Sequence, residues 1–244
     1  DGQTVLRNVA KEPEVEDLAD FLISIGAKIR GAGTDEIIID GVSDLNGSIF
    51  KIPADRIEAG TYLIAAAITE GDIKISDIEP SRMNNILDKL KLSGATINVG
   101  DSHIHLSMSE NSINPVDIST APFPGFPTDM QAQFTVLNSL SNGSAVVTEN
   151  VFENRFMHVQ ELNRMGCNIT VKGSNAFIKG VSSLTGAPVM ATDLRASASL
   201  ILAGLCAEGE TIVDRIYHID RGYEKIEDKF RLLGANIYRE NSNG

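Results

Sequence analysis

The chain has 244 residues and a formal net charge of −12 at pH 7, which argues against nucleic-acid binding because neutralising phosphates requires a basic surface. Its composition is that of an ordinary globular protein, and its longest apolar runs are far shorter than a membrane span of about 20 residues. Only two cysteines occur, Cys167 and Cys206, without metal-type spacing. Such sparse cysteine usage predicts a reducing compartment, the cytoplasm.

A repeat of roughly 70 residues runs along the chain. Its first signature is a helix pattern that ends in Gly, followed by a small residue and a strand. The intervals are 68, 72 and 68 residues, and the glycines are Gly26, Gly94, Gly166 and Gly234. Glycine suits the left-handed position that closes a helix. A second signature, an acidic or amide residue before Gly at a strand start, recurs in phase at Asp1-Gly2, Glu70-Gly71, Asn142-Gly143 and Glu208-Gly209.

A third signature is an Asp that opens the helix before each of these strands, at Asp55, Asp129 and Asp193. Each unit is therefore predicted to contain an Asp-opened helix, a strand, a second helix, a Gly turn, and two strands joined by a tight turn. The Asp-opened helices are apolar nearly all round, which predicts burial, whereas the second helices keep a charged side. These patterns favour an α/β fold with helices of small residues inside and sheets outside.

The phase of the repeat indicates that the chain is a fragment. Residues 1–53 are predicted to be an incomplete unit, and residues 54–244 three further units without their final strands. Strands are expected at 210–217 and at 234–240, the latter without a hairpin partner. An unpaired last strand can pair with another chain, so a strand-exchanged homo-oligomer is one expectation.

Six segments resemble the UDP-N-acetylglucosamine enolpyruvyl transferase (1-carboxyvinyltransferase) family: KEPEVED (11–17), PADRIEAGTYLIAAA (53–67), FPTDMQAQF (126–134), ENVFENRFMHVQEL (149–162), ATDLRASASL (191–200) and VDRIYHIDRGYE (213–224). The resemblance covers the whole chain. It implies an inside-out α/β barrel of pseudo-threefold units, with buried helices surrounded by sheets. By this resemblance, residues 1–53 are the last unit of an N-terminal domain and residues 54–244 belong to a C-terminal domain.

The resemblance also implies a reaction and its partners. The enolpyruvyl group of phosphoenolpyruvate would pass to the 3-hydroxyl of UDP-N-acetylglucosamine with release of phosphate, without a metal or organic cofactor. This is the first committed step of peptidoglycan synthesis, and hence of cell-wall formation, cell shape, cell cycle and cell division. The family's catalytic acid lies on a loop that is not in this chain, so we expect the fragment alone to be inactive and to need the missing N-terminal part of the protein.

Two alternatives stay open. Shikimate-3-phosphate enolpyruvyl transferase shares the implied fold, although the wording DMQAQF and ENRFMH favours the sugar-nucleotide enzyme. The other alternative is a non-catalytic repeat scaffold, which the Asp and Arg residues at the helix starts argue against. No membrane or nucleic-acid partner is expected.

The helix starts and the resemblance together select acidic candidates. Helix N-termini favour anions because their N–H groups are free, and three Asp-led starts can converge at the centre of one pseudosymmetric domain. Asp129 is predicted to be the base that contacts the sugar hydroxyl, with a plain helix cap as its alternative. Asp193 is predicted to have a supporting acid–base or orienting role. Capping alone can explain Asp55.

Arginines supply the predicted cationic groups. Arg195 and Arg221 resemble anion clamps on the phosphoenolpyruvate side, because a guanidinium binds carboxylate or phosphate in a forked geometry. Arg221 is also included among the predicted catalytic residues. Arg155 and Arg56 occupy similar junctions and are weaker candidates for substrate binding.

Val151 and Phe152 match the segment that flanks the sugar nucleotide in the family, and Val151 is expected to offer a backbone contact. Filling of the apolar core is the alternative for both residues. No metal site is predicted. His103 and His105 alternate with apolar residues, which is the pattern of a half-buried strand.

Overall fold

A computed structural model describes residues 2–108 and 112–240, so the predictions at Asp1 and at residues 241–244 lie outside the described residues. The first unit contains β1 (Gln3–Arg7), α1 (Pro13–Ser24), β2 (Lys28–Arg30) and β3 (Glu36–Asp40). The second contains α2 (Arg56–Ile68), β4 (Asp72–Ser76), the 3-10 helix η1 (Pro80–Met83), α3 (Asn84–Leu92), β5 (Thr96–Val99) and β6 (His103–Ser107).

The third unit contains β7 (Ile118–Ser119), η2 (Thr128–Met130), α4 (Gln131–Ser139), β8 (Ser144–Thr148), α5 (His158–Arg164), β9 (Asn168–Lys172) and β10 (Asn175–Lys179). The fourth contains β11 (Leu184–Thr185), β12 (Pro188–Met190), α6 (Leu194–Cys206), β13 (Ala207–Glu208), β14 (Ile212–Asp214), η3 (Ile216–Arg221) and α7 (Ile226–Leu232).

The predicted repeat is confirmed by the strand order. In the first three units the opening strand pairs antiparallel with the last strand of the closing hairpin, giving the orders β1-β3-β2, β4-β6-β5 and β8-β10-β9. Helices α1, α3, α5 and α7 are each followed by a glycine with positive φ: Gly26 at 110°, Gly94 at 105°, Gly166 at 97° and Gly234 at 97°. A side chain would be strained at these angles, which explains why glycine recurs there.

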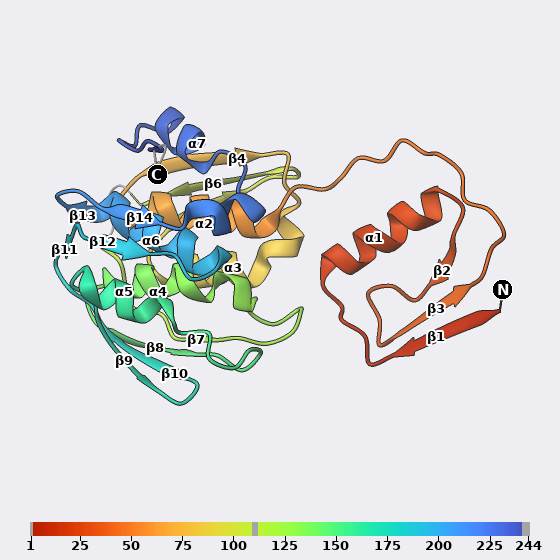
Figure 1. Ribbon diagram of the computed structural model, residues 1–244, viewed down its shortest axis with the longest axis horizontal. Helices are drawn as coiled ribbons and strands as arrows, with labels where there is room; N and C mark the ends of the chain where they lie inside the picture. Colours follow the sequence, from red (N-terminus) through yellow and green to blue (C-terminus); the bar gives the residue numbers. More distant parts are fainter. Residues whose placement is uncertain (1, 109–111, 241–244) are drawn as a thin grey trace.

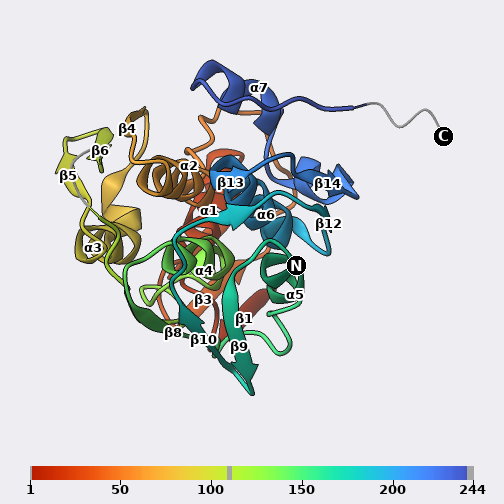
Figure 2. The ribbon, with the colours of Figure 1, turned by 90° about the vertical axis from the view of Figure 1, so that its left-hand side faces the viewer.

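The core forms around α2, α4 and α6, which contact one another. All nine residues of α4 are buried, and α2 is buried along nearly its whole length. Figure 2 shows these three helices in the middle, with β4–β6, β8–β10 and the β12–β14 pair outside them. The many Ala, Ser and Gly residues of α2 and α6 let the helices approach closely. The burial of α2 and α6 follows from their mainly apolar sequences, whereas α4 is buried although five of its nine residues are polar.

The fourth unit departs from the sequence prediction. The strand expected at 210–217 is only Ile212–Asp214, because Arg215 has a left-handed backbone with φ 61° and a 3-10 helix begins after it. Residues 235–240, which belong to the strand expected at 234–240 without a hairpin partner, pair with no strand within the described residues, and this expectation stays a prediction. Strand β14 instead pairs in parallel with β12.

The first unit lies to one side of the other three and is joined to them by residues 41–55 (Figure 1). Two ion pairs connect its helix α1 with the rest: Arg56 pairs with Glu14 and Arg82 pairs with Asp17. These contacts place α1 beside the starts of α2 and η1. Within residues 2–108 and 112–240, no helix has the length and apolar character needed to cross a membrane.

Candidate functional site

A cavity of about 930 Å³ lies between the first unit and the other three. This volume is within the range of pockets that hold small organic ligands, about 300 to 1,000 Å³. Its lining includes three helix starts, as the sequence predicted, together with one side of α1. The residues that matter below are Glu14, Asp17, Asp55, Arg56, Ile57, Arg82, Phe123, Thr128, Asp129, Val151, Phe152 and Arg195.

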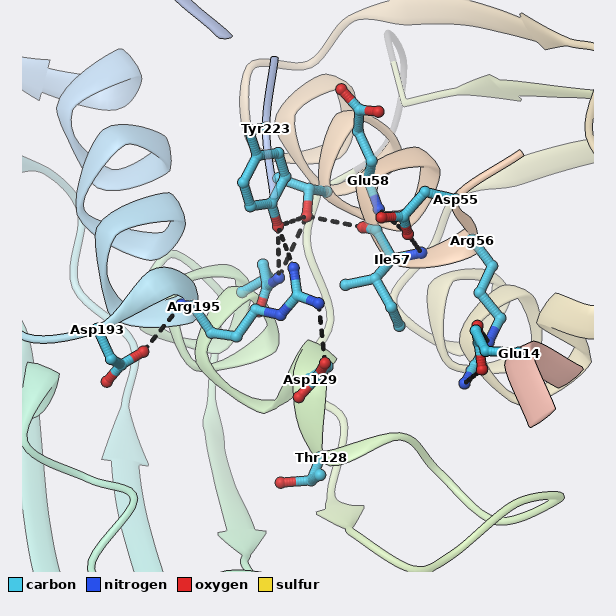
Figure 3. Close-up of polar contacts among 12 residues, drawn as sticks. Glu14, Asp55, Arg56, Ile57, Glu58, Thr128, Asp129, Asp193, Arg195 and Tyr223 are labelled. Carbon is cyan, nitrogen blue, oxygen red and sulfur yellow. Dashed lines mark hydrogen bonds and ion pairs between the residues drawn. The ribbon is translucent and has the colours of Figure 1, made fainter. Parts of the chain in front are cut away.

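Two of the three predicted Asp caps are confirmed. The Asp55 carboxylate accepts two backbone N–H groups of α2 at 2.7 and 3.0 Å. The Asp193 carboxylate accepts two backbone N–H groups of α6 at 2.8 and 2.9 Å (Figure 3). Asp129 behaves differently, because it lies inside the 3-10 turn Thr128–Met130 and α4 begins only at Gln131, with no side-chain cap. The capping alternative is therefore wrong for Asp129, and its carboxylate is available for other partners.

The carboxylate of Asp129 is held between two guanidinium groups from other segments. Arg155 Nη2 donates to Oδ1 at 2.7 Å and Arg195 Nη2 donates to Oδ2 at 2.8 Å. Figure 3 shows Arg195 reaching from the start of α6 to Asp129. Burial alone would raise the pKa of Asp129, but the charges and hydrogen bonds of Arg195 and Arg155 outweigh it and lower the pKa. Each carboxylate oxygen has two acceptor positions, so one remains free on each.

Arg195 is itself fixed by a polar group in the core. Its Nη1 donates to the hydroxyl of Tyr223 at 3.3 Å, and its guanidinium lies 5.7 Å from the centre of the Tyr223 ring. The Tyr223 hydroxyl lies 2.8 Å from Thr61 Oγ1 in α2, and Gln133 of α4 donates to the same Thr61 oxygen at 3.1 Å. Residues of the two other central helices, α2 and α4, therefore support the position of Arg195 through Tyr223.

Arg155 is held from two sides. Its Nη1 donates to Thr128 Oγ1 at 2.6 Å, and its guanidinium lies 4.8 Å from the centre of the Phe152 ring. Val151 and Phe152 line the cavity and are 37% and 57% exposed. The alternative that these two residues fill the apolar core is therefore wrong.

The remaining sequence candidates are placed apart from Asp129. Arg56 lines the cavity, but its buried guanidinium is paired with Glu14 and lies 5.7 Å from the Phe123 ring centre. Arg221 is exposed at the end of η3, outside the cavity lining, and its side chain has no hydrogen bond or ion pair within the described part of the chain. Asp193 caps α6 and is also outside the lining. Ligand roles for these residues stay predictions.

Sequence reasoning missed three residues that organise the site: Thr128, Glu149 and Tyr223. Glu149 is 3% exposed, and a buried carboxylate must find donors, so its position directly after an apolar strand was a usable signal. Tyr223 is fully covered within the core, where a hydroxyl also requires a partner. Thr128 gave no signal, since its neighbour Asp129 accounted for the helix start.

The possible metal ligands and the two cysteines are a further group of candidate residues. Among the described residues, no three His, Cys, Asp or Glu side chains are grouped so as to hold a metal ion. Burial raises the pKa of the Cys167 thiol to about 11 and that of the Cys206 thiol to about 12. Neither cysteine lines the cavity, so both are core thiols.

Comparison with known proteins shows the family of this chain. The model of the EPSP synthase (3-phosphoshikimate 1-carboxyvinyltransferase) family matches residues 1–230. The chain belongs to the EPSP synthase family. Within this family, the chain is 59% identical over 242 residues to UDP-N-acetylglucosamine 1-carboxyvinyltransferase of Coxiella burnetii (strain RSA 493 / Nine Mile phase I), which confirms the resemblance found in the motifs. The match covers 99% of this chain and 56% of that protein.

Other members of the EPSP synthase family show the same relation. The protein of the same name from Shewanella woodyi (strain ATCC 51908 / MS32) is 57% identical over 239 residues, covering 98% of this chain and 57% of that protein. The chain thus spans about half the length of the curated relatives it matches. Among solved structures, the enolpyruvyl transferase NikO from Streptomyces tendae matches with a TM-score of 0.86 and 27% identity, over 97% of this chain and 57% of that one.

EPSP synthase from Acinetobacter baumannii matches with a TM-score of 0.74 and 17% identity, over 99% of this chain and 58% of that one, which shows a shared fold. The expected mixed α/β enolpyruvyl transferase fold is therefore confirmed.

Proposed function

We propose that the whole protein transfers the enolpyruvyl group of phosphoenolpyruvate to the 3-hydroxyl of UDP-N-acetylglucosamine. The observation that carries this proposal is the clamp of Arg155 and Arg195 on Asp129, at a cavity wall where three helix starts meet. In this clamp the Asp129 carboxylate, which can accept a hydrogen bond from a hydroxyl, lies beside two guanidinium groups that can bind anionic groups of a substrate. The 59% identity to an enzyme named for this reaction supports the sugar nucleotide over shikimate 3-phosphate as the acceptor.

The proposed reaction has two steps. In the first, the sugar hydroxyl oxygen forms a bond to C2 of phosphoenolpyruvate while a proton is added to C3. In the second, the bond between C2 and the phosphate oxygen breaks, phosphate leaves, and a proton leaves C3. Such chemistry requires a base near the hydroxyl, an acid for the enol carbon, and cations for phosphate and carboxylate.

In this proposal Asp129 accepts a hydrogen bond from the sugar hydroxyl and takes its proton. Its lowered pKa makes it a weak base while both arginines are in place. An anionic substrate that draws Arg195 towards itself weakens one ion pair, so the pKa of Asp129 rises towards its ordinary value and the carboxylate becomes a better proton acceptor. Substrate binding would then prepare the base.

The other candidates take binding roles. Arg195 and Arg221 hold the phosphoenolpyruvate side, with Arg221 and Asp193 assisting the chemistry. Arg155 and Arg56 assist at the cavity wall. The exposed 151–152 segment contacts the sugar nucleotide through the Val151 backbone and the Phe152 side chain. The position of both residues in the cavity lining supports this assignment.

We also propose the architecture of the whole protein. Residues 1–53 form the last unit of an N-terminal domain, and residues 54–244 form most of a C-terminal domain whose helices are enclosed by sheets as an inside-out barrel. Ala235 and Ile237 pack against the core without strand partners among the described residues, so we propose that missing N-terminal strands, or a second copy, pair with this segment. A place in cytoplasmic peptidoglycan synthesis, and through it in cell shape and division, accords with two free cysteines.

Complementation tests the proposed function. The chain is mixed with the N-terminal segment of the Coxiella burnetii relative, assembly is shown by gel filtration, and phosphate release from phosphoenolpyruvate is followed with UDP-N-acetylglucosamine. Phosphate release that Asp129→Ala abolishes supports the proposal. An assembled complex that releases phosphate only with shikimate 3-phosphate, or with neither acceptor, overturns it.

A further inference from the structure

Glu149 follows strand β8 and, at 3% exposure, is the only Asp or Glu that is buried among the described residues. Its Oε1 accepts hydrogen bonds from the backbone N–H groups of Val151 at 2.8 Å and Phe152 at 3.0 Å, and from Thr120 Oγ1 at 2.9 Å. Its Oε2 accepts from Thr128 Oγ1 at 2.7 Å. Four donors therefore converge on one carboxylate. Glu149 itself is not among the residues that line the cavity.

These bonds fix the direction of the Thr128 hydroxyl. A threonine hydroxyl has one hydrogen to donate, and an ionised carboxylate can only accept. Because Thr128 donates that hydrogen to Glu149, its lone pairs are left for Arg155, whose Nη1 donates to Thr128 at 2.6 Å. The other amino group of Arg155 donates to Asp129 at 2.7 Å. A continuous path of hydrogen bonds thus runs from Glu149 to Asp129.

We propose that Glu149 is a positioning residue that sets two parts of the site at once, the backbone of residues 151–152 and the Arg155–Asp129 pair. The inference rests on the proposed function, because both parts are assigned there to the sugar nucleotide. Glu149 joins them through a single buried group that touches neither substrate. Its role is to present the backbone of Val151 and the carboxylate of Asp129 in one fixed relation to each other.

The isosteric change Glu149→Gln tests this role, because it keeps the shape of the side chain and replaces one accepting oxygen with a donating NH2 group. If the amide oxygen faces the two backbone N–H groups, the amide nitrogen faces Thr128 and takes the place of an acceptor. The Thr128 hydroxyl then has no acceptor at residue 149. If its hydrogen turns towards Arg155, it meets the N–H donor of that guanidinium, and the hydrogen bond between the two residues is lost. Glu161→Gln is the matched control, since Glu161 is also largely covered, with 15% side-chain exposure, but lies on α5 and accepts from Met190 N away from the cavity.

The first readout is the titration of the Asp129 carboxyl carbon by NMR in this chain, without any substrate. The resonance is assigned by its loss in Asp129→Asn. We expect Glu149→Gln to move the midpoint upwards by about half a unit to one unit, because Arg155 no longer holds Asp129 in place, whereas Glu161→Gln leaves it unchanged. A folded Glu149→Gln chain with an unchanged midpoint overturns the proposal, and so does an equal shift in the control.

A double-mutant cycle with Thr128→Val decides whether Glu149 acts through this hydroxyl. Both single changes interrupt the same path, so their shifts of the Asp129 midpoint should not add, and the double variant should resemble the larger single shift. Additive shifts would show that Glu149 reaches Asp129 by another route, and the proposal of a positioning path would be overturned.

Kinetics of the complemented assembly supply the functional readout. Glu149→Gln should raise KM for UDP-N-acetylglucosamine about tenfold, the equivalent of one charge-assisted hydrogen bond, with a smaller change in KM for phosphoenolpyruvate. Equal changes in both constants contradict a role on the sugar side. If the parent assembly transfers nothing to UDP-N-acetylglucosamine, the proposed function fails, while the substrate-free titration still decides whether Glu149 positions Asp129.

Discussion

Arg56 at the start of α2 and Glu14 in α1 form a forked ion pair across 42 positions of the chain, with Nε–Oε1 at 2.8 Å and Nη2–Oε2 at 3.2 Å. The Arg56 side chain is 8% exposed, whereas Glu14 is 57% exposed. Arg56 is therefore the member of the pair that depends on its partner. Together with Arg82 and Asp17, the pair holds the first unit against the cavity.

Glu14→Ala should destabilise the chain by leaving a buried guanidinium without its carboxylate. We expect a loss of about 1 to 2 kcal/mol, less than for a fully buried pair because Glu14 is half in water. Urea unfolding measures the change. Asp20→Ala, on the same helix at an exposed position, is the control and should have almost no effect. Equal stability of the two variants would contradict a structural role for the Arg56–Glu14 pair.

Asp129→Asn should lower activity of the complemented enzyme by about 100-fold or more, the usual effect of losing a general base. It should also change how stability depends on pH. The pKa of Asp129 is lowered in the folded chain, so its stabilising effect is full above the unfolded value of about 4 and is lost as pH falls through the folded value. Parent and variant should therefore differ most in urea unfolding at pH 7 and less at pH 3, which lies below the unfolded value. A constant difference at both pH values would contradict this account.

Because His158 is buried, we expect the free energy of unfolding to fall in mild acid, independently of Asp129. Burial lowers its pKa to about 4; the Asp193 charge opposes this shift and the Arg155 charge adds to it. Since the unfolded imidazole binds a proton near pH 6.5, stability should fall by up to about 3 kcal/mol between pH 6.5 and pH 4. The variant His158→Gln should remove this dependence, as measured by urea unfolding across that range. If both proteins lose the same stability over the range, His158 is not its source.

Tyr223→Phe should weaken the anchoring of Arg195. The hydroxyl it removes lies 2.8 Å from Thr61 Oγ1 and accepts from Arg195 at 3.3 Å, so we expect a loss of about 1 kcal/mol in thermal or urea unfolding. Tyr217→Phe is the matched control, because Tyr217 is 61% exposed on η3. The proposed anchoring is contradicted if the two substitutions cost the same.

Much of the fold was predictable because it depends on local rules that repeat. Glycine at Gly26 and its three equivalents is required by a positive φ, and the mainly apolar helices α2 and α6 have almost no polar side to leave in water. The meeting of helix starts at the cavity followed from the same periodicity. One failure was also local, because the left-handed backbone of Arg215 ended β14 early.

The sequence allowed the residues of the site to be predicted, but not the hydrogen bonds and ion pairs between them. The motifs named Asp129, Arg155 and Arg195, but the pairs among them join positions 26 and 66 residues apart, which no local pattern encodes. Glu149 was overlooked because its function depends on four donors that meet only in the folded chain. Long-range pairing of this kind is determined by packing, so it became visible with the structure.

Helix α4 begins two residues after its aspartate, one residue later than α2 and α6 begin after theirs, and this delay separates the third unit from the others in the chain. In the units of α2 and α6 the aspartate carboxylate accepts hydrogen bonds from backbone N–H groups of the helix that follows it. Such a cap contributes about 1 kcal/mol to stability. In the third unit a 3-10 turn releases the same carboxylate to face arginines of other segments. The same Asp-led helix start can thus present its carboxylate either to its own helix or to distant side chains, depending on the local winding of the backbone.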